Sequence, residues 1–418
     1  GDVYKRQTWN VSGAWNVHEE NFFNSISKAV SHLSLKASYS LTADRPSVTN
    51  ALAVIQSYSP WRPSAGVTES GLTIKDLENS DLTYEKKHEL NIGADLGFLD
   101  NRINLTVDWY KRDNFDLIGR VMTQGIGGQI QKYGNVATMK SRGIEFSLST
   151  KNIKTKDFSW TTDFIYSHMK NEVTKFNTST RAFNLVSGIG FSREGYPVNS
   201  LFSYDFRGLN EDGVPTFINE AGVLTSTDIN FQETERFDNL VYSGPSEPTD
   251  VGSFGNIFQY KGLRLNVFIT YSFGNVVRLD PVFSSIYNDL DAMPREFRNR
   301  WMTPGDERYT DVPAIVSSRQ VRNDSKLSYA YNAYNYSTAR IAKGDFIRMK
   351  EISLTYDFPK RWIKKLRMSN LALKIQATNL FLIYADKKLN GQDPEFFNSG
   401  GVATPVPKQF TLTLKIGL

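Results

Sequence analysis

The final nine residues of this 418-residue chain, Phe410 to Leu418, read F-T-L-T-L-K-I-G-L and constrain the fold more than any other stretch. Apolar side chains at every second position alternate with Thr, Lys and Gly, which puts the two sets on opposite faces of a β-strand. A strand of about 9–11 residues that is apolar outward and polar inward is the unit of a membrane-spanning β-barrel. A soluble β-sandwich also alternates, so this strand alone leaves both folds open.

The same alternation recurs along the chain and predicts about eleven strands, each near the length that a tilted strand needs to cross a bilayer. The predicted strands are residues 9–17, 33–41, 89–98, 103–110, 144–149, 158–166, 254–260, 263–273, 346–358, 370–380 and 408–418.

The links between these strands alternate strictly between short and long. The short links are residues 18–32, 99–101, 152–157, 261–262 and 359–368, and the long links are 43–87, 111–142, 170–249, 275–345 and 381–407. Outer-membrane barrels have short periplasmic turns and long extracellular loops, whereas a sandwich has no reason to alternate in this way. Phe202, Tyr204 and Phe206 mark one extra strand within 170–249, which would need a partner if it spanned the membrane.

Composition is compatible with this interpretation. The mean hydropathy of −0.40 suits a barrel, because half of its strand residues face a polar lumen. No run of about 18 apolar residues is present to form a transmembrane helix. The 20 Tyr, 27 Phe and 7 Trp suit interfacial girdles or sugar-stacking loops, although strands of soluble proteins also favour aromatic residues.

The absence of cysteine excludes disulfides and thiolate sites. The net charge of +5 comes without a basic cluster, which gives nucleic-acid binding little support.

Eleven strands in an open sheet would present two unpaired edges to lipid, which is forbidden. We therefore expect an all-β fold: the C-terminal half, about 11 strands, of a transmembrane antiparallel barrel with roughly 22 strands. The chain begins without Met or a signal peptide, so we expect its front to be missing. Residues 1–7, G-D-V-Y-K-R-Q, resemble a translated adapter sequence, so the expected barrel portion is 8–418.

Several motifs, spread in order from Trp15 to the C-terminal region, resemble one family. They are W-N-V-H-E-E-N-F-F (15–23), L-S-L-K-A-S-Y-S-L-T (33–42), L-T-Y-E-K-K-H-E-L-N-I-G-A-D-L-G-F-L-D-N-R-I (82–103), Y-G-N-V-A-T-M-K-S-R-G-I-E-F-S-L (133–148), Y-K-G-L-R-L-N-V-F-I-T-Y-S-F-G (260–274), G-D-F-I-R-M-K-E-I-S-L-T-Y-D-F-P (344–359), N-L-F (379–381) and D-P-E (393–395). Ser40 stands where the family usually has glycine. Together the motifs resemble the C-terminal barrel of SusC/RagA-type TonB-dependent outer-membrane transporters.

The resemblance implies a location in the outer membrane of a Gram-negative bacterium and active import of a nutrient, with oligosaccharide the commonest substrate and peptide an alternative. It also implies a plug inside the barrel, a segment that contacts TonB, and a SusD-like surface lipoprotein that closes over the mouth. Neither the plug nor the TonB-contacting segment is found in this sequence, and without them the expected barrel portion could not be gated.

Aromatic and amide residues in the 275–345 link are the candidate substrate contacts, because rings stack on sugar faces and amides pair with hydroxyls. They are Trp301, Tyr329, Tyr331, Asn332, Tyr334 and Tyr336, with Asn335 beside them. The alternative is that they pack the loop against itself or against the lipoprotein. A second set should face the lumen and meet the plug or the solute, unless it supplies only general polarity: Asn104, Asp108, Tyr110, Glu145 and Arg264.

No catalytic or metal-binding pattern is evident. The four histidines, His18, His32, His88 and His168, lack metal-ligand spacing. The glycine-rich residues 125–128 are not a full phosphate-binding fingerprint and are expected at a hairpin tip. We therefore expect no enzyme activity, cofactor or metal. Two other functions stay open: a soluble β-rich adhesin or carbohydrate-binding module, and a passive porin with the same wall.

Overall fold

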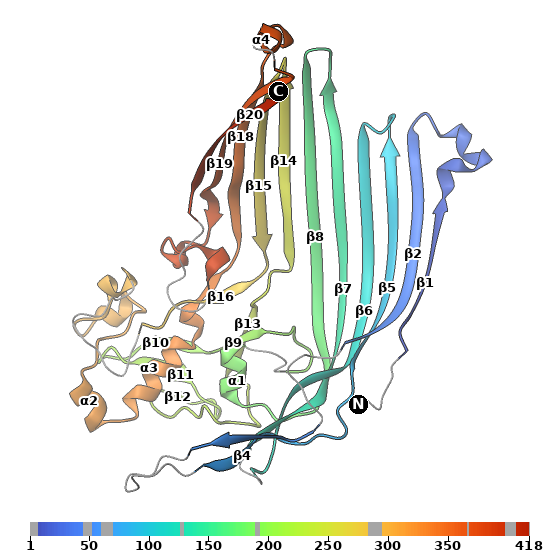
Figure 1. Ribbon diagram of the computed structural model, residues 1–418. Coiled ribbons are helices and arrows are strands. Elements are labelled where there is room, and N and C mark those ends of the chain that lie inside the picture. Colours follow the sequence, from blue (N-terminus) through green and yellow to red (C-terminus); the bar gives the residue numbers. More distant parts are fainter. Residues whose placement is uncertain are drawn as a thin grey trace.

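Eleven strands form one continuous antiparallel sheet in the computed structural model, which confirms the predicted number. The structure describes residues 7–44, 52–59, 70–125, 129–188, 193–282, 295–365, 368–397 and 407–417, so Leu418 lies outside the described residues. Figure 1 shows these strands side by side as a curved wall. In spatial order they are β1 (Trp9–Asn16), β2 (Val30–Asp44), β5 (Glu85–Phe98), β6 (Ile103–Met122), β7 (Gln131–Lys154), β8 (Phe158–Phe176), β14 (Asp250–Tyr260), β15 (Leu263–Phe273), β18 (Phe346–Asp357), β19 (Asn370–Ala385) and β20 (Gln409–Gly417).

The two faces of this sheet differ in chemistry as the alternation predicts. Phe410, Leu412 and Leu414 of β20 share one face, and Phe410 is 75% exposed. The register continues this apolar face across the neighbouring strands, for example from Leu412 to Ile375 to Leu354. On the other face Lys36 forms an ion pair with Asp95, which also accepts a hydrogen bond from the Thr106 hydroxyl at 2.9 Å. An apolar outer face and a polar inner face are the arrangement of a transmembrane barrel wall.

Aromatic rings lie near both ends of the apolar face. Near the ends of the strands that carry the long links, Trp9 and Tyr39 meet edge to face with their centroids 5.4 Å apart. At the other end, Trp160 stacks on Phe258 at 5.6 Å. Such rings favour the boundary between lipid and water because one end of each is apolar and the other polar. The two groups therefore mark two aromatic girdles.

Short and long links alternate as predicted except between β6 and β7, where the link, residues 123–130, is itself short. The tightest is Lys261-Gly262, where both residues have positive φ, 49° and 106°, as a two-residue hairpin that follows the strand twist requires. A Cβ on Gly262 would lie 2.8 Å from the Asp357 carbonyl oxygen. The other short links are residues 17–29, 99–102, 155–157 and 358–369, which contain η1 (Val17–Glu19), η2 (Asn21–Ser25) and α4 (Lys360–Lys365).

Some predicted boundaries are wrong: β8 continues to Phe176 and β19 to Ala385, into the expected long links 170–249 and 381–407, and the largest difference lies at residues 111–142. Residues 111–142 are not a long loop, because β6 continues to Met122 and β7 begins at Gln131. The two strands extend beyond the membrane as a paired ribbon, and their register shifts twice, between Asn114 and Leu117 and between Leu117 and Ile118. These bulges break the strict alternation from which the strand ends were predicted. Of the glycine-rich residues expected at the tip, 126–128 lie outside the described residues.

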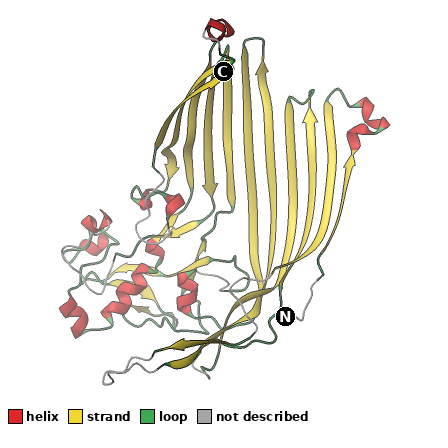
Figure 2. Cartoon of the chain, in the orientation of Figure 1, coloured by secondary structure: helices red, strands yellow, loops and turns green. Residues whose placement is uncertain are grey.

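The long links carry the remaining elements, and Figure 2 shows most of the helices gathered at that end of the wall. They are β3 (Val54–Tyr58), β4 (Gly71–Asp76), α1 (Ala182–Ser187), β9 (Ser200–Tyr204), β10 (Phe206–Leu209), β11 (Pro215–Ile218), β12 (Leu224–Thr225), β13 (Leu240–Pro245), β16 (Val276–Arg278), η3 (Arg295–Asn299), η4 (Asp306–Arg308), α2 (Ser318–Asn323), α3 (Leu327–Asn335), η5 (Thr338–Arg340), β17 (Ile341–Lys343), η6 (Lys387–Leu389) and η7 (Pro394–Phe396).

Two of the long links fold together into one unit, called the loop domain: residues 177–188, 193–249, 274–282 and 295–345. Its apolar core joins Phe202 and Leu240 from the first link to Phe297 and Tyr334 from the second. The strand expected at Phe202–Phe206 belongs to this unit, because β9 pairs with β13 and β10 with β11. It does not span the membrane, so the number of membrane-crossing strands is unchanged.

Among the described strands, β1 and β20 each pair with one neighbour only and form the two edges of the wall. No helix within the described ranges has the length and apolar character to cross a membrane.

The face assignment predicts opposite outcomes for two adjacent positions in the middle of β15. Val267→Arg places a charge on the apolar face, where it costs about 2–4 kcal/mol at the bilayer midplane. Asn266→Arg places the same charge on the polar face, where Asn266 donates to Glu351 at 3.2 Å. We expect Val267→Arg to lower the yield of folded protein in the membrane fraction and Asn266→Arg to preserve it. Gel mobility of unheated samples measures that yield, and equal losses would contradict the assignment.

Candidate functional site

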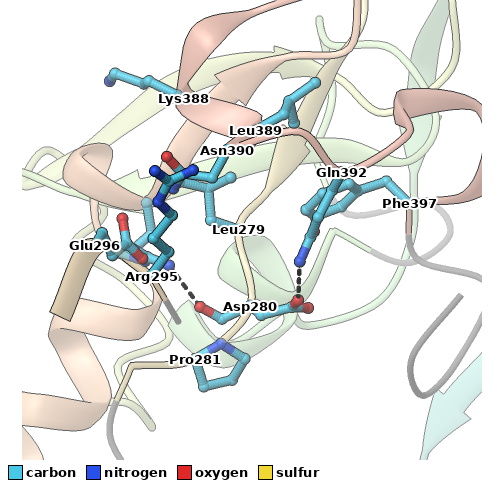
Figure 3. Close-up of a pocket in the computed structure, with 11 residues that line it drawn as sticks. Leu279, Asp280, Pro281, Arg295, Glu296, Lys388, Leu389, Asn390, Gln392 and Phe397 are labelled. Carbon is cyan, nitrogen blue, oxygen red and sulfur yellow. Dashed lines mark hydrogen bonds and ion pairs between the residues drawn. The ribbon is translucent and has the colours of Figure 1, made fainter. Parts of the chain in front are cut away.

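A polar cavity of about 350 Å³ lies where the loop domain meets the link between β19 and β20. Figure 3 shows side chains that line this cavity, which come from segments that are separate in the chain. They are Leu279, Asp280 and Pro281 after β16, Arg295, Glu296 and Arg340 from the 3-10 helices η3 and η5, and Lys388, Leu389, Asn390, Gln392 and Phe397 from the last link. The cavity therefore lies beyond the long-link ends of the strands, at the mouth of the wall.

Arg340 holds one side of the cavity together. Its side chain is buried, with 2% of the residue exposed. Nη1 donates to the Glu296 carboxylate at 2.6 Å, and Nη2 donates to the Asp280 carbonyl oxygen at 2.6 Å. Because a buried guanidinium needs compensating partners, this arrangement ties η3 and the segment after β16 to the end of η5.

The opposite side is formed by a tight turn at Asn390 and Gly391, whose φ values are 53° and 88°. Asp386 caps the preceding helix η6 by accepting from the Lys388 amide at 3.0 Å, and it also accepts from the Lys343 amide at 2.8 Å. The Gln392 side chain donates to the Asp280 carboxylate across the cavity at 3.2 Å. The turn is thus fixed to both β17 and the loop domain.

An ion-pair cluster around the buried Arg348 anchors the same link to the barrel wall. Arg348 of β18 pairs with the Asp393 carboxylate. The Arg348 Nε lies 3.0 Å from a Glu395 oxygen, as an ion pair without hydrogen-bond alignment. Lys350 reaches Glu395 at 3.8 Å. Asp393 and Glu395 belong to the D-P-E motif, so this motif fixes the segment between the lining residues Gln392 and Phe397.

The cavity offers charges of both signs to a ligand. Arg295 and Lys388 are exposed cations at its rim, and Asp280 is an accessible carboxylate. Phe397 is the one aromatic ring among the described lining residues. Such an arrangement can hold amide, ammonium and carboxylate groups through charge-assisted hydrogen bonds. It offers little aromatic surface for stacking.

The predicted aromatic contacts do not line this cavity. Tyr331 and Tyr334 are 1% and 2% exposed and pack inside the loop domain. The Tyr331 hydroxyl donates to the Ala314 carbonyl oxygen at 2.7 Å. Neither ring has surface to offer a substrate in this conformation, because both belong to the apolar face of α3.

The other members of that cluster are dispersed. Trp301 lies over Gly213, where an added Cβ would come within 2.5 Å of the ring, and its indole N–H donates to Glu307 at 3.1 Å. Tyr336 packs edge to face on Phe183. Tyr329, 49% exposed, and the half-buried Asn332 remain partly accessible on the loop-domain surface.

The five residues predicted to face the lumen lie on one face of the sheet by register. Glu145 and Arg264 are exposed there, Asp108 fills the space beside Gly93, and Asn104 donates to the Asn101 carbonyl oxygen near a short turn. Tyr110 is different: it is buried against Gly143, and the Arg112 guanidinium covers its ring at 4.0 Å. It therefore fills the wall and offers no surface to a solute.

Burial controls ionisation inside the loop domain. It raises the pKa of Tyr334 to about 12, against a smaller opposing effect of Arg340. It also raises the pKa values of Tyr331 and Tyr204. Burial lowers the pKa of Arg278 to about 10, so this guanidinium stays charged at neutral pH. Arg278 donates to the carbonyl oxygens of Phe202 and Val186 at 2.8 and 3.1 Å and thereby links the two halves of the domain.

The fold brings two histidines together that the sequence separates. The rings of His18 and His32 lie 4.0 Å apart between centroids, and His18 Nδ1 is 2.9 Å from the Leu33 carbonyl oxygen. Across the described part of the chain, no group of three or more His, Cys, Asp or Glu side chains has an arrangement that could hold a metal ion.

Sequence patterns did not identify the cavity. Asp280, Glu296, Arg340 and Lys388 come from segments far apart in the chain and fit no motif. The useful signal was the D-P-E motif, because it anchors the link that closes the cavity.

Loss of the Arg340 guanidinium should loosen this side of the domain. In Arg340→Met, Glu296 loses its partner and the Asp280 carbonyl loses a donor. Breaking a buried pair costs about 3–5 kcal/mol, and we expect about 3 because the Glu296 side chain keeps 20% exposure. Hydrogen exchange of the Leu279 and Asp280 amides should then be roughly 100-fold faster. Arg319→Met, at an exposed position of α2, is the matched control, and equal exchange in the two variants would contradict the proposed role of Arg340.

The buried tyrosines predict a loss of loop-domain stability at high pH. An unfolded tyrosine ionises near pH 10, whereas folded Tyr334 does so near 12. The folded state therefore keeps its proton over a range in which the unfolded state loses it. This contribution is complete below pH 10 and disappears as the pH rises from 10 to 12. Tyrosinate absorbance of the wild type minus that of Tyr334→Phe should show the delayed ionisation, and a midpoint near 10 in the folded protein would contradict it.

Comparison with known proteins places this chain in one family. The family described as TonB dependent receptor-like, beta-barrel, matches residues 2–380. TonB-dependent receptor P3 of Formosa agariphila is 26% identical over 400 residues, which cover 91% of this chain and 37% of that protein. TonB-dependent receptor SusC of Bacteroides thetaiotaomicron is 26% identical over 425 residues, covering 97% and 39%.

A solved structure, that of the RagAB peptide transporter, superimposes with a TM-score of 0.77 at 25% identity and covers 98% of this chain and 43% of the matched chain. The chain thus spans about two-fifths of the length of these two curated relatives. Because the family match extends over most of the chain, we conclude that it belongs to the TonB-dependent receptor-like β-barrel family, is of the SusC/RagA type, and is an outer-membrane protein of a Gram-negative bacterium.

Proposed function

We propose that this chain forms part of the wall of an active outer-membrane importer that takes up a small oligomeric nutrient. Family membership and the two-faced sheet support this function. In this proposal, sequence preceding residue 8 supplies the strands that join β1 and β20, the plug, and the segment that contacts TonB. The edges of β1 and β20 support that arrangement, because unpaired strand edges are not tolerated in lipid.

The proposed partner at the cell surface is a SusD-like lipoprotein that covers the loop domain. The loop domain carries exposed apolar side chains for such a contact: Tyr309 is 88% and Met302 64% exposed, and both lie near η4. The accessible Tyr329 is a second candidate contact, either with this lipoprotein or with substrate.

The cavity at the mouth bears on the substrate class. The family resemblance favours an oligosaccharide, whose neutral rings bind best to exposed aromatic faces. The cavity instead offers Arg295, Lys388 and Asp280, charges of both signs that fit the carboxylate, ammonium and amide groups of an oligopeptide. Tyr331 and Tyr334, the rings best placed in sequence for stacking on sugar, are buried. We therefore favour an oligopeptide over a neutral glycan, and the charged lining of the cavity is the observation that carries this choice.

Uptake of labelled oligopeptides and neutral oligosaccharides by cells that carry the complete transporter tests this choice. Arg295→Gln combined with Lys388→Gln should lower peptide uptake about ten-fold, since a hydrogen bond to a charged group contributes about 1.5–3 kcal/mol. The matched control is Arg319→Gln with Arg322→Gln, which removes the same charge from the exposed surface of α2.

If the double variant Arg295→Gln with Lys388→Gln lowered only oligosaccharide uptake, the proposed substrate would be a glycan and not a peptide. Uptake that persists after the proton-motive force is dissipated would instead support a passive pore and overturn active import.

A further inference from the structure

A row of three basic side chains crosses the outer face of the wall. The register sets Lys111 of β6 directly opposite Arg142 of β7, and Arg142 directly opposite Lys170 of β8. All three are exposed. They come from three different strands, so the sequence shows no basic cluster.

The row lies at the boundary of the apolar face that is nearer to the long links. The register row two positions before it on the same face, towards the short turns, includes Trp109 of β6 and Ile144 of β7, and His168 of β8 lies opposite Ile144. The apolar side chains of β6 that precede Trp109 on this face are Ile103, Leu105 and Val107. Because β6 leaves the membrane at its long-link end, the basic row meets the outer leaflet where its head groups begin.

A hollow of about 270 Å³ opens over this row, and its aromatic and charged lining residues are Trp109, Lys111, Lys140, Arg142, Lys170 and one carboxylate, Glu172. The hollow therefore has an aromatic ring on its membrane side and basic side chains on the side of the long links.

The acidic side chains nearby do not neutralise the row. Lys140, one row further out, lies opposite Asp113 and Glu172. Lys111 approaches Asp113 at 3.7 Å. No described acidic group forms an ion pair with Arg142 or Lys170. Like charges directly opposite on neighbouring strands destabilise a sheet, so an anion bound between them would relieve a repulsion built into the wall.

We propose that Lys111, Arg142 and Lys170 bind the phosphate groups of an anionic, phosphorylated lipid of the outer leaflet. Trp109 packs beside its sugar or upper acyl region, and the cations hold the phosphates through charge-assisted hydrogen bonds. The site is separate from the import cavity. It depends on the chain lying in the outer membrane and does not depend on peptide transport.

Native mass spectrometry of the complete protein in detergent, titrated with lipid A, a diglucosamine lipid that carries two phosphates, tests the proposal. The variant is Lys111→Gln with Arg142→Gln and Lys170→Gln, and gel mobility of unheated samples checks that it folds. We expect roughly 100-fold weaker binding, because each basic group near a charged membrane surface contributes about a five-fold factor. The control, Arg319→Gln with Arg322→Gln and Lys326→Gln, removes the same charge from in and beside α2 and should bind as the wild type does.

Two further measurements separate the sources of phosphate. Fully dephosphorylated lipid should bind the wild type as weakly as lipid A binds the variant. Inorganic pyrophosphate should not displace lipid A at equal concentration, because it lacks the acyl chains that contact the apolar face. Unchanged lipid binding by the variant, an equal loss in the control, or displacement by pyrophosphate would each overturn the lipid site. If the triple variant does not fold, Arg142→Gln alone gives the same comparison with a smaller expected loss.

Discussion

Pairing of backbone groups between strands is the constraint on which the rest of this structure depends. In hydrocarbon an unpaired N–H or C=O group costs several kcal/mol, because no water is present to replace the lost partner. The continuous register from β1 to β20 provides those partners along the wall. Once the register is fixed, alternate side chains are committed to lipid or lumen, and a shift by one residue would reverse every one of them. The polar pairs around Asp95 and the apolar row through Leu412 follow from this single commitment.

Much of the wall could be predicted because its signal is local. Each spanning segment repeats the same two-residue period, and the order of link lengths needs no knowledge of tertiary contacts. The prediction failed where the strands leave the membrane. Residues 111–122 and 131–142 are paired along most of their length, yet they carry no lipid-facing pattern, and the bulge near Asp116, whose φ is 56°, interrupts the period.

The candidate sites were less accessible to sequence reasoning, because each is assembled from residues that only the fold brings together. The tyrosines of α3 form a conspicuous cluster in the sequence. A cluster of aromatic residues in a loop is as typical of a core as of a binding surface, and Tyr331 and Tyr334 belong to the core. The cavity depends on Asp280, Arg340 and Lys388 from three segments. The row through Arg142 depends on strand register, which converts distant positions into neighbours.

The shared core of the loop domain links events on the two sides of the membrane during assembly. Phe202 and Leu240 are covered by Phe297 and Tyr334, and the hairpin of β14 and β15 lies between these two halves in the chain. Neither half can cover the apolar side of the other until both have reached the cell surface, with the hairpin of β14 and β15 inserted between them. Arg278 adds its bonds to Phe202 and Val186 only at that stage. A loop domain with a complete core at the outer surface therefore indicates that the intervening strands have been inserted.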